Sequence, residues 1–287
     1  MIPAAFDYER ASSIDEAVGL LTEHGDEAKL IAGGHSLLPL MKLRLATPSV
    51  LVDLGGIADL AYISDTGDQL AIGALSTHHQ VATDPLVLRY LPLLAHVAAQ
   101  VGDPQVRHRG TIGGSIAHGD PASDLPAVVL ALGGTLVLSG AGGRSREVAA
   151  AEFHLGFLET AIGADEILTE IRVPKLTGAW GFEKLTKRAQ DWAIVGAVVV
   201  SSNGASSSEG SDSSDGRSVG VALINMGSVP LRAAAVEAAI AAGESPAEAA
   251  RHASDEADPA ADINASVEFR RHLATVLVQR ALETALT

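Results

Sequence analysis

The pattern of hydrophobic and polar positions changes its period repeatedly along the chain. Short apolar runs bounded by turn residues indicate strands at residues 29–32, 50–54, 69–73, 135–139 and 166–173. Helical spacing of apolar residues, together with capping signals, predicts helices over residues 13–25, 90–101 and 124–132. Because strands and helices are interleaved without a regular repeat, the pattern predicts an α+β fold.

A change in composition near residues 176–180 predicts a domain boundary, so we expect a first domain at 1–176 and a second at 177–287. Residues 201–218 are almost entirely Ser, Gly, Asp and Glu, which bury too little apolar surface to order the segment and predict a flexible hairpin insertion. The second domain is otherwise expected to hold strands at 181–185, 193–201 and 219–224, then alanine-rich helices that include 266–286.

Two glycine pairs carry the main chemical signal. They lie in residues 32–36 (AGGHS) and 111–115 (TIGGS). Because glycine lacks a side chain, backbone N–H groups in such segments can closely approach an anion. Either pair alone is typical of a turn, and neither belongs to a nicotinamide-binding fingerprint or a P-loop. Together they predict two loops that clamp the two phosphates of a dinucleotide.

Polar residues near the glycine pairs are candidates for the same site. The hydroxyl groups of Ser36 and Thr111 can donate hydrogen bonds to phosphate oxygens. Asp124 either accepts hydrogen bonds from a ribose or caps the helix that follows it. Lys29 either lies along a bound cofactor or is simply solvated. His35 either forms a hydrogen bond, attaches a flavin covalently or has no such role.

Charge and composition narrow the class of protein. The 287 residues carry 35 acidic and 20 basic side chains, a net charge of −15, which argues against nucleic acid as a partner. No apolar run reaches the roughly 20 residues of a membrane span, and the N-terminus lacks the order of a signal peptide. We therefore expect a cytoplasmic protein without an integral membrane segment, with a peripheral position at the inner face of the membrane left open.

No cysteine is present among the 287 residues. The sequence therefore supplies no thiolate nucleophile, no disulfide and no cysteine ligand for an iron–sulfur cluster. The ten histidines are scattered without the spacing of metal ligands, so we expect no metal site in this chain.

The two glycine segments and their neighbours resemble a known family. AGGHSLLPLMKLRL at 32–45 and TIGGSIAHGDPASDLPAVVLAL at 111–132 are similar to the FAD-binding medium subunits of carbon monoxide dehydrogenase, within the molybdenum hydroxylases that include xanthine dehydrogenase. The resemblance covers nearly the whole chain, because it continues through EILTEIRVP at 166–174, GFEKLTKRAQDWAIVG at 181–196 and INASVEFRRHLATVLVQRAL at 263–282.

The resemblance implies a fold and a set of cofactor contacts. The fold would be a two-part FAD-binding domain of the vanillyl-alcohol-oxidase (PCMH) type, followed by a smaller α+β domain of the CO dehydrogenase flavoprotein type. The residues implied to contact FAD are Lys29, Ala32, Gly33, Gly34, His35, Ser36, Leu37, Thr111, Ile112, Gly113, Gly114, Ser115, Asp124, Leu168 and Lys184. Gln190 departs from the family, which often has glycine there, and this leaves the role of Asp191 and Trp192 near the flavin open.

The resemblance also implies an electron-transfer function. FAD would receive electrons from an iron–sulfur small subunit and pass them to an external acceptor, while a molybdopterin large subunit oxidises the substrate, with the complex assembled as a dimer of heterotrimers. No residue of this chain would then be catalytic. Two alternatives are a free-standing flavin oxidase, in which His35 would carry a covalent flavin, and a scaffold that has lost the cofactor. The bare glycines in both segments speak against the scaffold.

Overall fold

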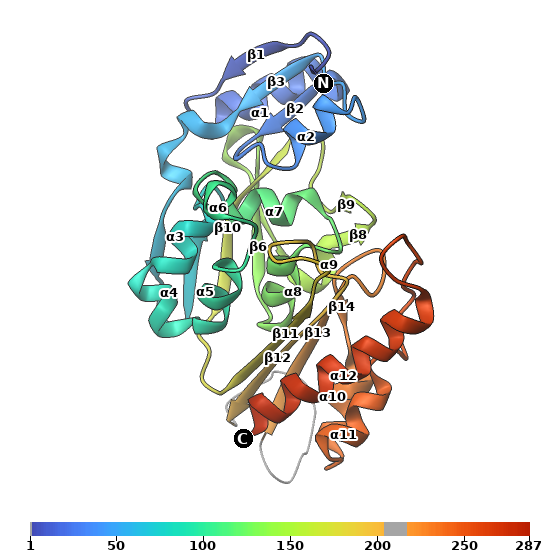
Figure 1. The fold of residues 1–287 in the computed structure, drawn as a ribbon. Coiled ribbons are helices and arrows are strands. Elements are labelled where there is room, and N and C mark those ends of the chain that lie inside the picture. The colour runs from blue at the N-terminus through green and yellow to red at the C-terminus, as the bar shows by residue number, and fades with distance from the viewer. Residues whose placement is uncertain (1, 204–216) are drawn as a thin grey trace.

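The structure is a computed structural model that describes residues 2–203 and 217–287. It contains three main sheets, stacked from top to bottom in Figure 1 in the order of the chain. The first is a small parallel sheet in the order β1-β3-β2, formed by β1 (Asp7–Arg10), β2 (Ala28–Ile31) and β3 (Val50–Asp53). It is covered by α1 (Ile14–His24), and α2 (Leu37–Lys42) follows β2 after the first glycine segment.

The small sheet is held by an apolar face that the sequence periodicity predicts. Ala17, Val18 and Leu21 of α1 are buried against Val50 and Val52 of β3 in one apolar cluster. The Ser13 side chain accepts a hydrogen bond from the backbone N–H of Glu16, which satisfies one of the free donors at the start of α1. The predicted helix start is therefore confirmed. The packing of α1 supports the small sheet, whose strand β2 leads into the first glycine segment.

The second sheet is antiparallel, and its central strand is β10 (Glu166–Pro174), the last strand of the N-terminal part. Its order is β4-β5-β10-β6-β7, with β4 (Ile63–Asp65), β5 (Gln69–Gly73), β6 (Thr135–Gly140) and β7 (Ser145–Ala149). A short hairpin is formed by β8 (His154–Gly156) and β9 (Glu159–Thr160). The helices are α3 (His78–Thr83), α4 (Pro85–Tyr90), α5 (Pro92–Ala98), α6 (Pro104–Arg109), α7 (Ile112–His118), α8 (Asp124–Ala131) and α9 (Ala150–Phe153).

The third sheet is buried on both faces and joins the two parts of the chain. Its antiparallel order is β11-β12-β13-β14, with β11 (Trp180–Leu185), β12 (Val195–Asn203), β13 (Arg217–Ile224) and β14 (Leu231–Arg232). Val198 and Ile224 belong to the same apolar cluster as α5 and α8, whereas Val199 and Leu223 pack with α10 (Ala234–Ala241) and α12 (Val267–Leu286). The helix α11 (Pro246–Ala249) lies between α10 and α12 in the chain. Figure 1 shows α12 crossing the sheet.

The structure corrects three details of the sequence prediction. The helix expected over 90–101 is shorter, because Tyr90 is the last residue of α4 and Pro92, which disfavours helical geometry at Leu91, begins α5, which ends at Ala98. The segment 111–115 is the start of α7, and not a loop. Residues 201–203 and 217–218 of the expected insertion belong to β12 and β13, and residues 204–216 lie outside the described residues. No helix among the described residues is both long and apolar enough to cross a membrane.

Candidate functional site

The two glycine segments lie directly against each other. A Cβ atom at Gly33 would lie 2.2 Å from the carbonyl oxygen of Arg109 and 2.8 Å from the Cα atom of Gly110, so only glycine permits this contact. Across the same junction, a Cβ at Gly114 would lie 3.9 Å from the Cβ of Ala32. The predicted convergence of the two segments is therefore present, and close backbone packing gives a second reason for the glycine at position 33.

The first segment offers unused hydrogen-bond donors. Among the described residues, the backbone N–H groups of Gly33, Gly34, His35 and Ser36 donate to no protein acceptor. Gly34 has φ +78°, a conformation that glycine adopts without strain. The Gly34 carbonyl accepts from Leu38 at 3.0 Å, which fixes the segment at the start of α2. Four successive unpaired N–H groups in a turn make a concave site suited to an anion.

The second segment contributes differently from the loop that the sequence predicts. Its backbone N–H groups from Ile112 onward are already bonded: Ile112 donates to Ser76 at 3.0 Å, and Gly113 donates to Ala74 at 2.9 Å. The N–H of Gly114 donates to the Thr111 hydroxyl at 3.1 Å, so Thr111 caps α7. What remains for an anion is the Thr111 hydroxyl hydrogen, at the point where the first segment meets the start of the helix.

Asp124 and Lys184 form a buried ion pair between the second and third sheets. The Asp124 Oδ2 atom lies 2.7 Å from the Lys184 Nζ atom, and each side chain is only 8% exposed. Asp124 is the first residue of α8, and Ser123 takes the N-cap position, so the capping role considered for Asp124 is wrong. Burial raises the pKa of Asp124, and the Lys184 ammonium offsets part of that effect.

One polar atom of this pair is left unpartnered. The Asp124 Oδ1 atom is buried and has no hydrogen-bond partner among the described residues. Leaving a buried acceptor unpaired costs roughly 1–3 kcal/mol, so the site is incomplete as the protein alone. A ligand hydroxyl or N–H group placed against Oδ1 would remove that cost.

The remaining predicted residues differ in how closely the structure connects them to the two glycine segments. Leu168 is buried beside a bulge in β10. The carbonyl of the next residue, Thr169, accepts a hydrogen bond from the Ala74 N–H, and the Ala74 carbonyl accepts one from the Gly113 N–H. Leu168 is thus linked to α7 through the backbone of Ala74. Leu37 and Ser115 are half-buried next to the two glycine pairs. Lys29 is exposed on β2 and makes no ion pair among the described residues.

A cavity of about 270 Å³ opens beside the junction of the glycine segments. Ala32, Gly33 and Thr111, all predicted from the sequence, line it. Its other lining residues, which the sequence analysis missed, are Arg10, Asp53, Gly55, Ile57, Ala58, Ala61, Leu75, Thr77, His108 and Arg109. They come from the first two sheets and their connections, and no local motif marks them, because only the tertiary fold brings them together.

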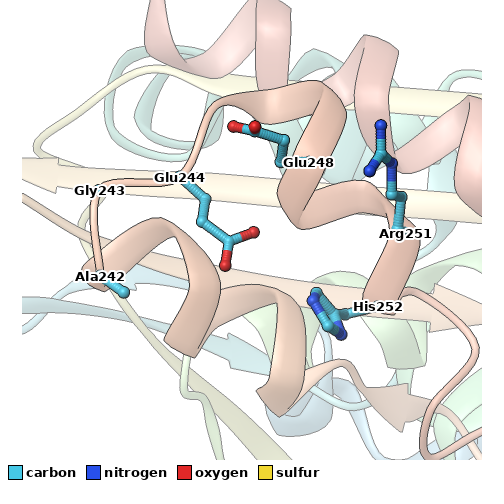
Figure 2. A pocket seen from close by; sticks show the side chains of 6 residues that line it. All are labelled: Ala242, Gly243, Glu244, Glu248, Arg251 and His252. Atoms are coloured by element: carbon cyan, nitrogen blue, oxygen red, sulfur yellow. The ribbon is translucent and has the colours of Figure 1, made fainter.

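A second hollow of about 440 Å³ lies entirely in the C-terminal part. Ala242, Gly243, Glu244, Glu248, Arg251 and His252 line it between α10 and the short helix after α11 (Figure 2). Its lining is open and charged, and none of the predicted cofactor contacts takes part in it. It is therefore separate from the candidate site.

His78 is a further residue that the sequence analysis did not select. Its ring is 4% exposed and lies against Gly110, and its backbone N–H donates to the Gly110 carbonyl at 2.9 Å. The ring Nδ1 atom has no partner among the described residues. Burial lowers the pKa of His78 to about 4, with smaller contributions from His35 and Arg107. The neutral imidazole of His78 thus packs against Gly110, which in turn contacts Gly33.

The depressed pKa of His78 predicts a pH dependence of stability. The folded-state pKa of about 4 lies below the unfolded value of 6.5, so this contribution is complete above pH 6.5 and is lost as the pH falls toward 4. Between pH 7 and pH 5 the free energy of unfolding should therefore fall by roughly 2 kcal/mol less in His78→Leu than in the parent chain. Urea unfolding at both pH values measures this difference. His272→Leu, at an exposed position of α12, is the control. An unchanged pH slope in His78→Leu would contradict the buried neutral state.

Comparison with known proteins gives full-length matches. Residues 4–176 match the family described as "FAD binding domain in molybdopterin dehydrogenase", and residues 180–285 match the "CO dehydrogenase flavoprotein C-terminal domain". The carbon monoxide dehydrogenase medium chain of Hydrogenophaga pseudoflava is 40% identical, over 99% of this chain and 98% of its own length. The nicotine 6-hydroxylase medium subunit of Paenarthrobacter nicotinovorans is 34% identical, over 98% and 97%.

Solved structures give the same result. The carbon monoxide dehydrogenase of H. pseudoflava lacking the Mo-pyranopterin moiety superimposes with a TM-score of 0.90 at 39% identity, covering 100% of this chain and 99% of that one. Quinoline 2-oxidoreductase from Pseudomonas putida 86 superimposes with a TM-score of 0.87 at 31% identity, covering 100% and 99%.

Fold and site together define a FAD-binding flavoprotein with a two-part cofactor domain and a smaller C-terminal domain, as the sequence predicts. The chain belongs to the family of flavoprotein subunits of the molybdopterin dehydrogenases, oxidoreductases that resemble carbon monoxide dehydrogenase, and its cofactor is FAD.

Proposed function

We propose that this chain is the FAD-carrying electron-transfer subunit of a molybdenum hydroxylase, most like aerobic carbon monoxide dehydrogenase. It would receive electrons from an iron–sulfur small subunit and deliver them to an external acceptor, while a molybdopterin large subunit oxidises the substrate. The observations that carry the proposal are the buried Asp124–Lys184 pair with its unpartnered Oδ1 atom and the open N–H donors of the first glycine segment.

The residues of the site fit the parts of FAD. The unpaired N–H groups of residues 33–36 and the Thr111 hydroxyl supply donors for the two phosphates. The cavity beside them, lined by small apolar residues together with Arg10 and Asp53, suits the adenosine end. We place the contacts of the flavin end at Asp124, Lys184 and Leu168, with Lys29, Leu37 and Ser115 at the edges of the site.

The bound FAD supplies the ability to take up single electrons and release two, which connects iron–sulfur chemistry to a two-electron acceptor. The work of this chain is to bind the cofactor, orient it and set its electrostatic surroundings. Lys184 places a positive charge in a desolvated position, where it acts more strongly than in water. No residue of the chain needs to move a proton from the substrate, because the substrate is oxidised elsewhere.

The assembly of this chain and its place in the cell follow from the same proposed role. Several relatives are named as medium chains or as subunits of complexes. We propose a dimer of heterotrimers in the cytoplasm or at the inner face of the membrane, with a division of this chain at 1–176 and 177–287. The lack of cysteine in the sequence agrees with iron–sulfur clusters held on another chain.

The test is gentle affinity purification of the tagged chain from its native host. Co-purifying chains are identified by mass spectrometry, and molybdenum, iron and acid-released FAD are quantified per mole of the tagged chain. Two stoichiometric partners, one recovered with iron and one with molybdenum, plus about one releasable FAD, are the expected result. A Gly33→Ala chain purified in parallel controls for flavin bound elsewhere in the complex.

Other outcomes would overturn the proposal. A yellow chain that purifies alone without metals would favour the free-standing oxidase, and flavin that resists acid release would direct attention to His35, which is exposed in the first glycine segment. A metal-containing complex without flavin on this chain would favour the scaffold alternative.

A further inference from the structure

Asn225 occupies an unusual place at the junction of the two parts of the chain. It follows directly after the end of β13 and has φ +61°, a left-handed conformation that asparagine tolerates better than most residues. Its backbone N–H donates to the carbonyl of Pro121 at 2.9 Å. Its side-chain amide donates to the carbonyls of Ala193 at 2.8 Å and Ile194 at 3.3 Å. One residue thus bonds to the segments on both sides of the boundary.

The Pro121 end of this link is rigidly connected to Asp124. The turn between them is closed by the Ala122 N–H, which donates to the Asp120 carboxylate at 2.9 Å, and by the Ser123 N–H, which donates to the Asp120 carbonyl at 3.0 Å. Pro121 and Ser123 are buried, and Asp124 begins α8 directly after them. A displacement of the Pro121 carbonyl would therefore move the Asp124 carboxylate with it.

The Ile194 end is connected to Lys184 in the same way. The Ile194 N–H donates to the Leu185 carbonyl at 2.8 Å and closes the connection between β11 and β12, one residue beyond Lys184. Lys184, Gly196 and Ile224 lie in register across β11, β12 and β13. The Ile194 carbonyl is held a second time by the guanidinium of Arg270, which is 2% exposed and is itself paired with Asp262 at 2.9 Å.

We propose that Asn225 is a positioning residue that sets the Asp124–Lys184 ion pair across the boundary between the two parts of the chain. The amide of Asn225 fixes the strand pair that carries Lys184, and its backbone fixes the turn that carries Asp124. Arg270 keeps the shared Ile194 carbonyl in place. The proposal rests on the proposed cofactor site, because the pair it positions is the one assigned to the flavin end of FAD.

The variant Asn225→Gly isolates this role. Glycine retains the left-handed backbone and the N–H bond to Pro121, and it removes the short side chain with its amide. The matched control is Ser218→Ala, a small change at the exposed far end of the same strand, β13. Both full-length chains, without flavin, are treated with limiting acetic anhydride, and the acetylation rate of each lysine is followed by peptide mass spectrometry. Lys42, which is exposed, serves as the internal reference.

The expected result is selective loss of protection at Lys184. Two hydrogen bonds are removed from the support of the pair, so Lys184 should acetylate about tenfold faster in Asn225→Gly, with Lys42 unchanged and the urea midpoint close to that of Ser218→Ala. An unchanged Lys184 rate would overturn the proposal. So would a faster rate at every lysine together with a large loss of stability, since that would mark a purely structural role.

A second titration separates this proposal from the assignment of the cofactor site. FAD added to the same two chains should bind about tenfold more weakly to Asn225→Gly, because the flavin end of the site is no longer fixed. If Lys184 loses protection but the FAD affinity is unchanged, Asn225 does position the pair, and the failure lies with the placement of the flavin beside it.

Discussion

Lys184→Met will strongly destabilise the chain without flavin. Removing the ammonium leaves the Asp124 carboxylate buried at 8% exposure without a partner, and breaking a buried pair in this way typically costs about 3–5 kcal/mol. The loss is measured as the free energy of unfolding in urea at pH 7. Because burial already raises the pKa of Asp124, the variant is expected to take up a proton there and so recover part of the loss at lower pH.

Two further variants test the cause of that loss. Arg144→Met removes the partner of Asp165 in an exposed pair whose side chains are 68% and 47% exposed, and it should cost no more than about 1 kcal/mol. Adding Asp124→Asn to Lys184→Met removes the unpaired charge and should restore part of the stability. Similar losses for Lys184→Met and Arg144→Met would show that the pair is not desolvated.

Gly33→Ala is expected to weaken FAD binding strongly. The new methyl group would lie 2.2 Å from the Arg109 carbonyl oxygen, far inside contact distance, and the obstacle is backbone that cannot rotate away. Separating the two glycine segments should cost about 1–3 kcal/mol of stability and reduce the affinity for FAD about 10- to 100-fold. Isothermal titration with FAD measures the affinity, and thermal unfolding measures the stability.

Gly19→Ala provides the contrast for Gly33→Ala. Gly19 lies within α1, and a Cβ there would meet nothing within 4 Å, so this variant should gain roughly 0.5–1 kcal/mol of stability and bind FAD normally. Full FAD affinity in Gly33→Ala would mean that the contact with Arg109 has no part in the site. Gly33→Ala is expected to lower stability as well as FAD affinity, because its new Cβ atom clashes with the Arg109 carbonyl of the protein itself.

The sequence predicts the elements of this fold better than it predicts how they meet. Strand periodicity locates β3, β5 and β6 to within about a residue, because their apolar faces leave a local signal. The convergence of 32–36 with 111–115 follows from the chemistry that both segments share. The helical start at Thr111 has a local cause in its side-chain cap, yet the glycine pair that follows is more typical of a turn and hides it.

Other features have no local signal at all. The contact of Gly33 with Arg109, the burial of His78 and the cavity lining at Arg10 and Asp53 all depend on residues far apart in the chain. The pairing of Asp124 with Lys184 joins positions 60 residues apart, and only the resemblance to a family placed both near one ligand. Asn225 was not selected, since an isolated asparagine after a strand is typical of an ordinary turn.

The central position of β10 sets the earliest moment at which FAD can bind during synthesis. Strands β5 and β6 both pair with β10 and not with each other, so the second sheet stays open until residues 166–174 have left the ribosome. The Gly113 amide depends on Ala74, and Ala74 depends on Thr169 of that strand. A nascent chain arrested before residue 166 should therefore not retain FAD, although it already contains both glycine segments. Cofactor loading then belongs to the last part of translation or follows chain release.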